Sequence, residues 1–469
     1  MLEVMRHLAI PDVVRLLQVR HGTTRALLSH ECTFWILLVE ATRATYPLGC
    51  PRYADLSQYN LQTLKDLITS RFKLQRNWNL EFPKVVDLQV TSLDECVKIL
   101  GLVQGTPIAL VHMPKTEDVA CWDVQLGAQF PFPPIKVGGK LNNVSEPFVS
   151  SYGVCSFVVV GGKVEDTSKG ERWQYIITIK HDNRKATGFD SVRTATAYPT
   201  SPDGSIFLTR DVIGALIANK REDHCTIVTS KIGDGPGSES ESPMKLNCTA
   251  SEFSDRHLMV AFTCRGHFFN ILEDGSRAQI QHVSRERLTH SEKVATVYEA
   301  DILDVGKTCR PMYPILPSCP SYGVAAAFVR EAKVRDETTF TFLPATPINS
   351  PTGDDGVSSP LTFPFPCPTA RVPGRTIDPS LMCMDHGGLN IVGVLQDPNP
   401  MNSPNLVLVH YHPETQTTSV HYPDVPPSLD LDEMQNLWAD DTAGVIYLIG
   451  KEELTGKKSQ WSLFALRYA

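Results

Sequence analysis

The first 79 residues place apolar side chains at the three- and four-residue intervals typical of short helices. Pro11 and Asp12 separate the first helix from the second, because proline ends a helix and aspartate caps the next one. Gly22 and Ser29 mark two further boundaries. The apolar positions that define these helices are Leu2, Met5, Leu8, Val13, Leu16, Leu17, Leu27, Leu28, Trp35 and Leu38.

A longer amphipathic segment follows. Residues 60–68 repeat the helical spacing of apolar positions, and the pattern ends near residues 77–79, before Pro83. The sequence therefore predicts short helices in residues 1–40 and a helical linker in residues 41–80.

From about Val85 the pattern changes to short β-rich runs separated by turn residues. Sequences such as Pro202-Asp203-Gly204 and Gly387-Gly388 tolerate the backbone of tight hairpins, which predicts antiparallel pairing. The predicted strands lie within residues 108–111, 155–160, 175–179, 205–208, 225–228, 258–262, 268–271, 324–328, 391–395, 406–409, 445–449 and 461–466.

The length of this β-rich region favours one architecture over others. Many short strands without amphipathic helices between them indicate a sandwich, a barrel or a propeller. Residues 81–469 exceed the size of one sandwich or barrel and suit an irregular β-propeller of roughly six to seven four-stranded blades. The fold class predicted is mainly β, with an N-terminal α module.

Two segments of the β region are predicted to be loop insertions. Residues 233–243 are polar, acidic and rich in glycine and proline, so they bury little apolar surface. Residues 344–379 carry nine prolines, each of which removes a backbone donor that a strand ladder needs.

Composition narrows the possible partners. The formal net charge of -8 offers no basic surface for a phosphate backbone, so nucleic acid is not expected. The longest apolar run, residues 34–39, is stopped by Glu40 and is too short to cross a bilayer. The N-terminal residues lack the apolar centre of a signal peptide, and the twelve cysteines show no close pairing. We therefore expect a cytoplasmic or nuclear protein that is not secreted and has reduced cysteines.

Candidate catalytic and metal sites are weak in this sequence. No two cysteines lie two to four residues apart, which argues against a RING or zinc ribbon, and no cofactor motif is complete. His410 and His412 alternate on one predicted strand face, and His421 can face them across a hairpin. Without a carboxylate ligand, a solvated strand face is the better interpretation than a metal site. Asp440-Asp441 precedes a strand, which is typical of a turn rather than of paired catalytic carboxylates.

The first forty residues resemble the F-box, a three-helix motif that binds the Skp-type adaptor of cullin-based ubiquitin ligases. Residues 4–8 stand where F-box sequences have Ile/Leu-x-x-x-Leu, and Asp12-Val13 stands where they have Asp-Leu. Residues 19–21, residues 27–28 and Trp35 follow at the family's usual distances. The opening Leu-Pro-x-Glu of the motif is absent, and Arg20 replaces its usual cysteine.

The resemblance implies a non-catalytic substrate-recognition subunit of an SCF-type ubiquitin ligase. Its partners would be a Skp-type adaptor, a cullin scaffold and an unknown protein client bound by the propeller, as in many fungal F-box proteins. The alternatives are a propeller hydrolase and a plain interaction scaffold with a degenerate F-box. The residues expected to bind the adaptor are Met5, Leu8, Pro11, Val13, Leu16, Val19, Leu27 and Trp35.

Overall fold

The computed structural model describes residues 31–469 with gaps, and it leaves the first thirty residues undescribed. The gaps are residues 51–53, 138–139, 146, 151–152, 163–171, 183–184, 195–204, 209–211, 220–223, 232–243, 248–256, 263–266, 274–276, 285–295, 302–312, 316–323, 333–335, 345, 348–360, 363–367, 377–378, 386, 414 and 453–459.

In the part of the chain that the structure describes, two α-helices precede the strands. Helix α4 spans Cys32–Thr45 and helix α5 spans Leu61–Trp78, with the 3-10 turn η1 at Leu56–Gln58 between them. The side chain of Asn60 caps α5 by accepting a hydrogen bond from the backbone N–H of Thr63 at 2.8 Å. The amphipathic spacing that predicted this helix is thereby confirmed, including its end at Trp78.

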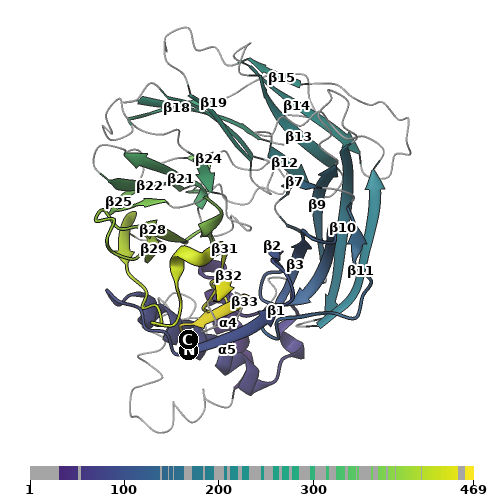
Figure 1. The fold of residues 1–469 in the computed structure, drawn as a ribbon, viewed down its shortest axis with the longest axis vertical. Coiled ribbons are helices and arrows are strands. Elements are labelled where there is room, and N and C mark those ends of the chain that lie inside the picture. The colour runs from purple at the N-terminus through teal and green to yellow at the C-terminus, as the bar shows by residue number, and fades with distance from the viewer. Residues whose placement is uncertain are drawn as a thin grey trace.

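The rest of the described chain is β-structure, and every strand pairing in it is antiparallel. Short sheets follow one another around a central axis, as in a β-propeller (Figure 1). The prediction of a mainly β chain with an N-terminal helical part is confirmed at this level.

The sheets are built as follows. One contains β1 (Asp87–Leu93), β33 (Gln460–Arg467), β32 (Val445–Glu452) and β31 (Met434–Asp440) in that order. The next contains β2 (Lys98–Leu102), β3 (Ile108–Met113), β4 (Asp118–Asp123) and β5 (Ala128–Gln129), with β6 (Ile135–Lys136) beside β4. A third contains β11 (Lys185–Thr194), β10 (Arg172–Asp182), β9 (Val154–Gly162) and β7 (Lys140–Val144), with β8 (Phe148–Ser150) beside β9.

Further sheets continue the series. One contains, in order, β12 (Ser205–Leu208), β13 (Val212–Asn219), β14 (His224–Lys231) and β15 (Met244–Asn247). Another contains, in order, β16 (His257–Phe262), β17 (His267–Glu273), β18 (Arg277–Ser284) and β19 (Thr296–Asp301). Next come β20 (Tyr313–Ile315), β21 (Val324–Ala332), β22 (Glu337–Pro344) and β25 (Thr369–Pro373), and a small pair, β23 (Thr346–Pro347) with β24 (Leu361–Thr362). The remaining sheet holds β26 (Arg375–Thr376), β28 (Asn390–Gln396), β29 (Asn405–His412) and β30 (Thr417–His421), with β27 (Met382–Met384) beside β28. Two short 3-10 turns, η3 (Pro379–Leu381) and η4 (Leu431–Glu433), lie among these strands.

The ring closes by pairing its first strand with its last one. Strand β1 lies against β33 in an unbroken register from Asp87 opposite Arg467 to Leu93 opposite Trp461. Because β1 is made early in the chain and β33 at its end, this pairing joins the two ends of the β region. Closure of this kind fixes the first strand of the β region to its last sheet.

One predicted loop proves to contain a buried strand. Residues 344–379 include β25, and its Ala370 and Val372 are buried in a core shared with β21 and β22. The prolines are tolerated because β25 is the edge strand of its sheet and Pro373 is its last residue. The other predicted loop, residues 233–243, lies outside the described residues.

Candidate functional site

Seven of the eight residues predicted to bind an adaptor lie outside the described residues, and only Trp35 can be placed. Trp35 is on α4 and is 8% exposed. Its ring meets the edge of Phe34, with centroids 5.4 Å apart, and the Lys65 ammonium lies 5.7 Å from its centroid. Trp35 therefore contributes to the core between the two helices in this conformation, rather than to a free binding surface.

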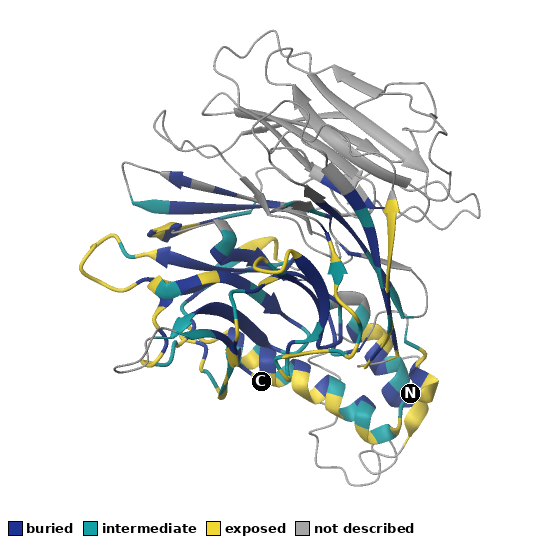
Figure 2. Ribbon diagram, turned by 45° about the vertical axis from the view of Figure 1, so that its right-hand side comes forward, coloured by how far each residue is buried: buried dark blue, intermediate teal, exposed yellow. Residues whose placement is uncertain are grey.

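Helix α5 belongs to two hydrophobic cores. Its buried residues are spaced by three and four positions and form one stripe (Figure 2). Leu64 and Ile68, in the first half, pack with Trp35 and other residues of α4. Leu74 and Trp78, in the second half, pack with strands of the closing sheet.

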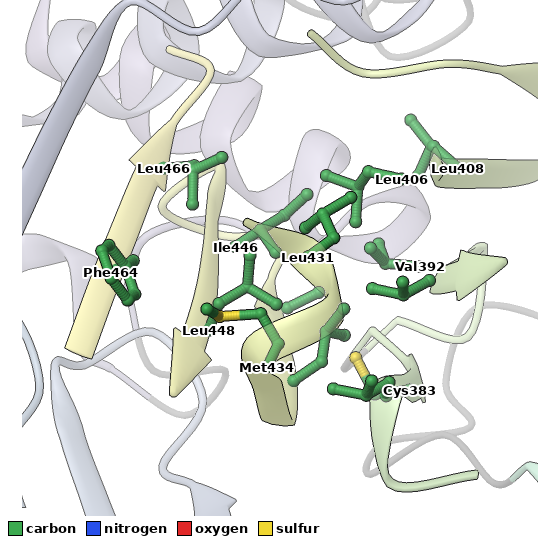
Figure 3. Packing of buried hydrophobic residues seen from close by; sticks show 14 of the residues in the cluster. Cys383, Val392, Leu406, Leu408, Leu431, Met434, Ile446, Leu448, Phe464 and Leu466 are labelled. Carbon is green, nitrogen blue, oxygen red and sulfur yellow. The ribbon is translucent and has the colours of Figure 1, made fainter. Parts of the chain in front are cut away.

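The second of these cores lies between two neighbouring sheets. Figure 3 shows its side chains: those of β32 and β33 approach those of β28 and β29, with Met434 and Cys383 below. The labelled members are Cys383, Val392, Leu406, Leu408, Leu431, Met434, Ile446, Leu448, Phe464 and Leu466. Helix α5 is thus a structural part of the β region and not a flexible tether.

Arg71, in the middle of α5, places a positive charge where this helix meets the β region. It is 6% exposed, and its Nη1 donates a hydrogen bond to the backbone oxygen of Asp441 at 3.3 Å. Its guanidinium lies 5.0 Å from the ring centroid of Tyr46, which comes from the segment between α4 and η1. Arg71 therefore links the helices to the turn between β31 and β32.

Two fully buried carboxyl groups, those of Asp441 and Asp385, lie near Arg71. Asp441 follows a residue that the sequence placed in a turn. Asp440 forms the predicted turn, because its Oδ1 accepts hydrogen bonds from the backbone N–H groups of Thr442 and Ala443. The next residue, Asp441, is 0% exposed, and its Oδ2 accepts a hydrogen bond from the N–H of Gly387 at 3.2 Å. The turn prediction is therefore correct for Asp440, while Asp441 has a buried position that it did not anticipate.

The second carboxyl group is Asp385, which follows β27 and is also 0% exposed. It accepts hydrogen bonds from the backbone N–H of Leu389 at 2.9 Å and from the side-chain amide of Asn390. Burial, aided by the nearby Asp441 charge, raises the pKa of Asp385 well above its usual range. Burial also raises the pKa of Asp441 to about 7, although Arg71 opposes that shift.

A row of histidines continues the network across β29 and β30. His421 Nδ1 lies 2.7 Å from the backbone oxygen of Leu80 and therefore donates to it. The other ring nitrogen of His421, Nε2, lies 2.8 Å from Ser419 Oγ, and Ser419 Oγ lies 2.9 Å from His412 Nε2. The predicted proximity of the histidines is confirmed, but they are partly buried rather than on a solvated face.

His410 joins the histidine row to the carboxyl pair. Its Nδ1 lies 2.6 Å from Asn390 Oδ1, and the amide of Asn390 donates to Asp385. Burial, together with His412, Arg71 and His421, holds the pKa of His410 well below its usual range, so the ring is neutral.

This polar network is suited to holding elements together more than to turning over a substrate. Its two carboxyl groups have no exposed surface that a substrate can reach. Within the described residues, no three His, Cys, Asp or Glu side chains are grouped so that they can hold a metal ion. None of the described helices is long and apolar enough to span a membrane.

A groove of about 670 Å³ runs along α5 beside its contact with the β31–β32 turn. Thr63, Asp66 and Ser70 of α5 line one wall, and the turn residues Gln125 and Thr442 line the opposite wall. Its lining is mixed, with hydroxyl and amide groups beside Leu67 and Leu74.

Comparisons with known proteins find resemblance in solved structures only. No protein-family model and no curated protein matches the sequence. The chain is similar to the WD40 domain of SCAP from fission yeast, with a TM-score of 0.41, 8% identity, and coverage of 81% of this chain and 98% of that one. It is also similar to an uncharacterised protein, lmo1340, from Listeria monocytogenes, with a TM-score of 0.38, 10% identity, and coverage of 77% and 92%. Hsv2 from Kluyveromyces lactis matches with a TM-score of 0.32, 11% identity, and coverage of 69% and 84%.

The close approach of α5 to the β31–β32 turn is testable at Gly444. This glycine has φ of +64°, and a Cβ there would lie 2.6 Å from Leu74 Cδ1. Replacing Gly444 by alanine should therefore lower the free energy of unfolding by about 1–3 kcal/mol, measured by chemical denaturation. Gly188→Ala is the matched control, because its nearest neighbour is the flexible side chain of Lys180. Equal effects of the two substitutions would contradict the close packing of α5 on this turn.

Proposed function

We propose that this chain is the substrate-recognition subunit of an SCF-type cullin ubiquitin ligase. Residues 1–40 bind a Skp-type adaptor, which connects the chain to the cullin scaffold, and the β region binds a protein client. The β region has seven blades in this proposal, corresponding to the seven sheets of four or five strands that the described residues form. The chain itself catalyses no reaction, and it works in the cytoplasm or nucleus.

The observation that carries the proposal is the double role of α5. Its first half is fixed to α4 and its second half to the closing sheet, so the helices and the β region hold one relative position. Transfer of a group to a client requires the two to be held in a productive orientation. A rigid connection between an adaptor-binding end and a client-binding end meets that requirement, whereas a flexible linker does not.

Trp35 has a supporting role in this proposal. It stabilises the core of α4 and α5, and it lies directly after the residues predicted to bind the adaptor. The adaptor contacts would then come from the residues predicted ahead of it: Met5, Leu8, Pro11, Val13, Leu16, Val19 and Leu27.

The proposal is tested by affinity purification of the full chain, scored for the adaptor and the cullin. Replacing Leu8 and Leu16 by aspartate should abolish their recovery, because two unpaired charges in a desolvated interface cost several kcal/mol. The control is Leu126→Asp, which places the same charge on a β-region leucine that is 70% exposed. Absence of adaptor and cullin from the wild-type sample would instead favour a plain interaction scaffold. Aggregation of the double variant, but not of the control, would show that the first helices are a structural cap.

A further inference from the structure

At the contact between α5 and the β region, buried acidic groups outnumber buried basic groups. Arg71 supplies one positive charge, while Asp385 and Asp441 are two carboxyl groups with no exposed surface. One guanidinium can balance one carboxylate, and a second carboxylate would be an uncompensated charge in a dry site. Asp440 is buried as well, but its carboxylate is held by the N–H groups of Thr442 and Ala443 and by the Thr442 hydroxyl. The excess negative charge therefore falls on Asp385 and Asp441, whose side chains hydrogen-bond each other and hold a proton between them.

The other ionisable groups around the pair do not supply the missing positive charge. His410 faces the pair through Asn390 and is neutral, and the buried thiol of Cys383 is neutral because burial raises its pKa. Asp440 adds a further negative charge, which raises the pKa of Asp441. Of the described groups that act on the two carboxyls, Arg71 is the one that carries a positive charge.

The pair lies where three parts of the chain meet. Asp441 belongs to the β31–β32 turn, Asp385 follows β27, and Arg71 approaches from α5. Pro47, from the segment between the helices, packs so closely that a Cβ on Gly387 would lie 3.2 Å from its ring and 3.0 Å from Asp441 Oδ2. Any change in the charge of the pair therefore acts on the attachment of the helices.

We propose that the helices are held on the β region by the proton that Asp385 and Asp441 share beneath Arg71, and that loss of this proton loosens α5 and residues 46–50. The device is independent of which partner the chain binds. It makes the attachment of the helices, and hence the position of whatever precedes them, sensitive to pH.

The direction of the effect follows from linkage. A carboxyl whose pKa is higher in the folded state than in the unfolded state stabilises the folded state most at low pH. The ordinary pKa of Asp441 is 3.8, and its pKa in the folded protein is about 7. Its contribution to stability is therefore lost as the pH rises through that range. His410 acts in the opposite sense, because its depressed pKa costs stability as the pH falls below its ordinary value of 6.5. A variant of the pair is therefore needed to separate the two effects.

The test is hydrogen exchange of the full chain at pH 6 and pH 8.5, corrected for the intrinsic pH dependence of exchange. Protection of residues 61–78 should fall at least about tenfold at the higher pH, which corresponds to one unit of pKa difference. Protection of β9 and β10 should stay unchanged. Asp441→Asn keeps an acceptor for the Gly387 N–H but cannot ionise, so it should remove the fall. Asp432→Asn, at an exposed position of η4, should leave it in place.

Three results would overturn the proposal: no fall in the wild type, an equal fall in α5 and in the strands, or an undiminished fall in Asp441→Asn. Asp385→Asn provides a second variant with the same expectation. If neither variant folds, the wild-type profile decides, because a fall confined to residues 46–50 and 61–78 supports the device and a uniform one contradicts it.

Discussion

Replacing Leu74 by alanine should lower the free energy of unfolding of the whole protein by about 3–5 kcal/mol. Leu74 is 1% exposed and packs with the closing sheet, so alanine would leave a cavity in a core that the helix shares with β33 and β32. We expect the strands and the helix to unfold together at a lower denaturant concentration. Hydrogen exchange of residues 61–78 and of strands β32 and β33 measures the two parts separately.

Leu67→Ala is the matched control for this experiment. Leu67 is on the same helix but is half-buried beside the groove, so its loss should cost less than about 1.5 kcal/mol. A result in which Leu74→Ala unfolds the helices and leaves the strand transition unchanged would show that α5 is an independent linker after all.

Replacing Leu466 by aspartate should prevent the ring from closing. Leu466 is 0% exposed on β33, opposite Leu88 of β1, and a carboxylate there would have no described cationic partner in the surrounding apolar core. The cost of such a charge is several kcal/mol, enough to exhaust the stability of a typical domain. We expect loss of the cooperative thermal transition and binding of an apolar dye.

Val90→Asp places the same charge on the same pair of strands. Val90 lies opposite Phe464 in the β1–β33 register, but it is 45% exposed, so the carboxylate can stay hydrated. This variant should keep a thermal transition close to that of the wild type. Similar losses in both variants would mean that the pairing itself, and not the core behind it, is sensitive to charge.

The helix α5 and the apolar central strands are predictable from the sequence because their signals are local. The apolar period and the Asn60 cap define α5, and the run of residues 445–449 identifies the first part of β32. Strand β1 (Asp87–Leu93) instead mixes polar and apolar residues and has no continuous apolar run. Its partner β33 lies at the other end of the β region, so no local pattern could identify it as the closing strand.

The polar network shows the same limit. The sequence identifies the turn at Asp440 and the shared strand face of His410 and His412. It does not reveal that Asp441 meets the N–H of a glycine 54 positions earlier, or that Arg71 meets the backbone of Asp441 across 370 positions. Contacts of this kind depend on how the sheets are placed around the axis, and a single sequence does not encode them in its spacing.

The closure of the ring also sets an order of events during synthesis. The side chain of Asn77, at the end of α5, donates a hydrogen bond to the backbone oxygen of Tyr468, 391 positions later. At a synthesis rate of roughly 5–20 residues per second, α5 waits on the order of 20 to 80 s for this partner. During that interval the face bearing Leu74 and Trp78 has no closing sheet to cover it. The nascent chain is therefore expected to need a chaperone until its last strand is made.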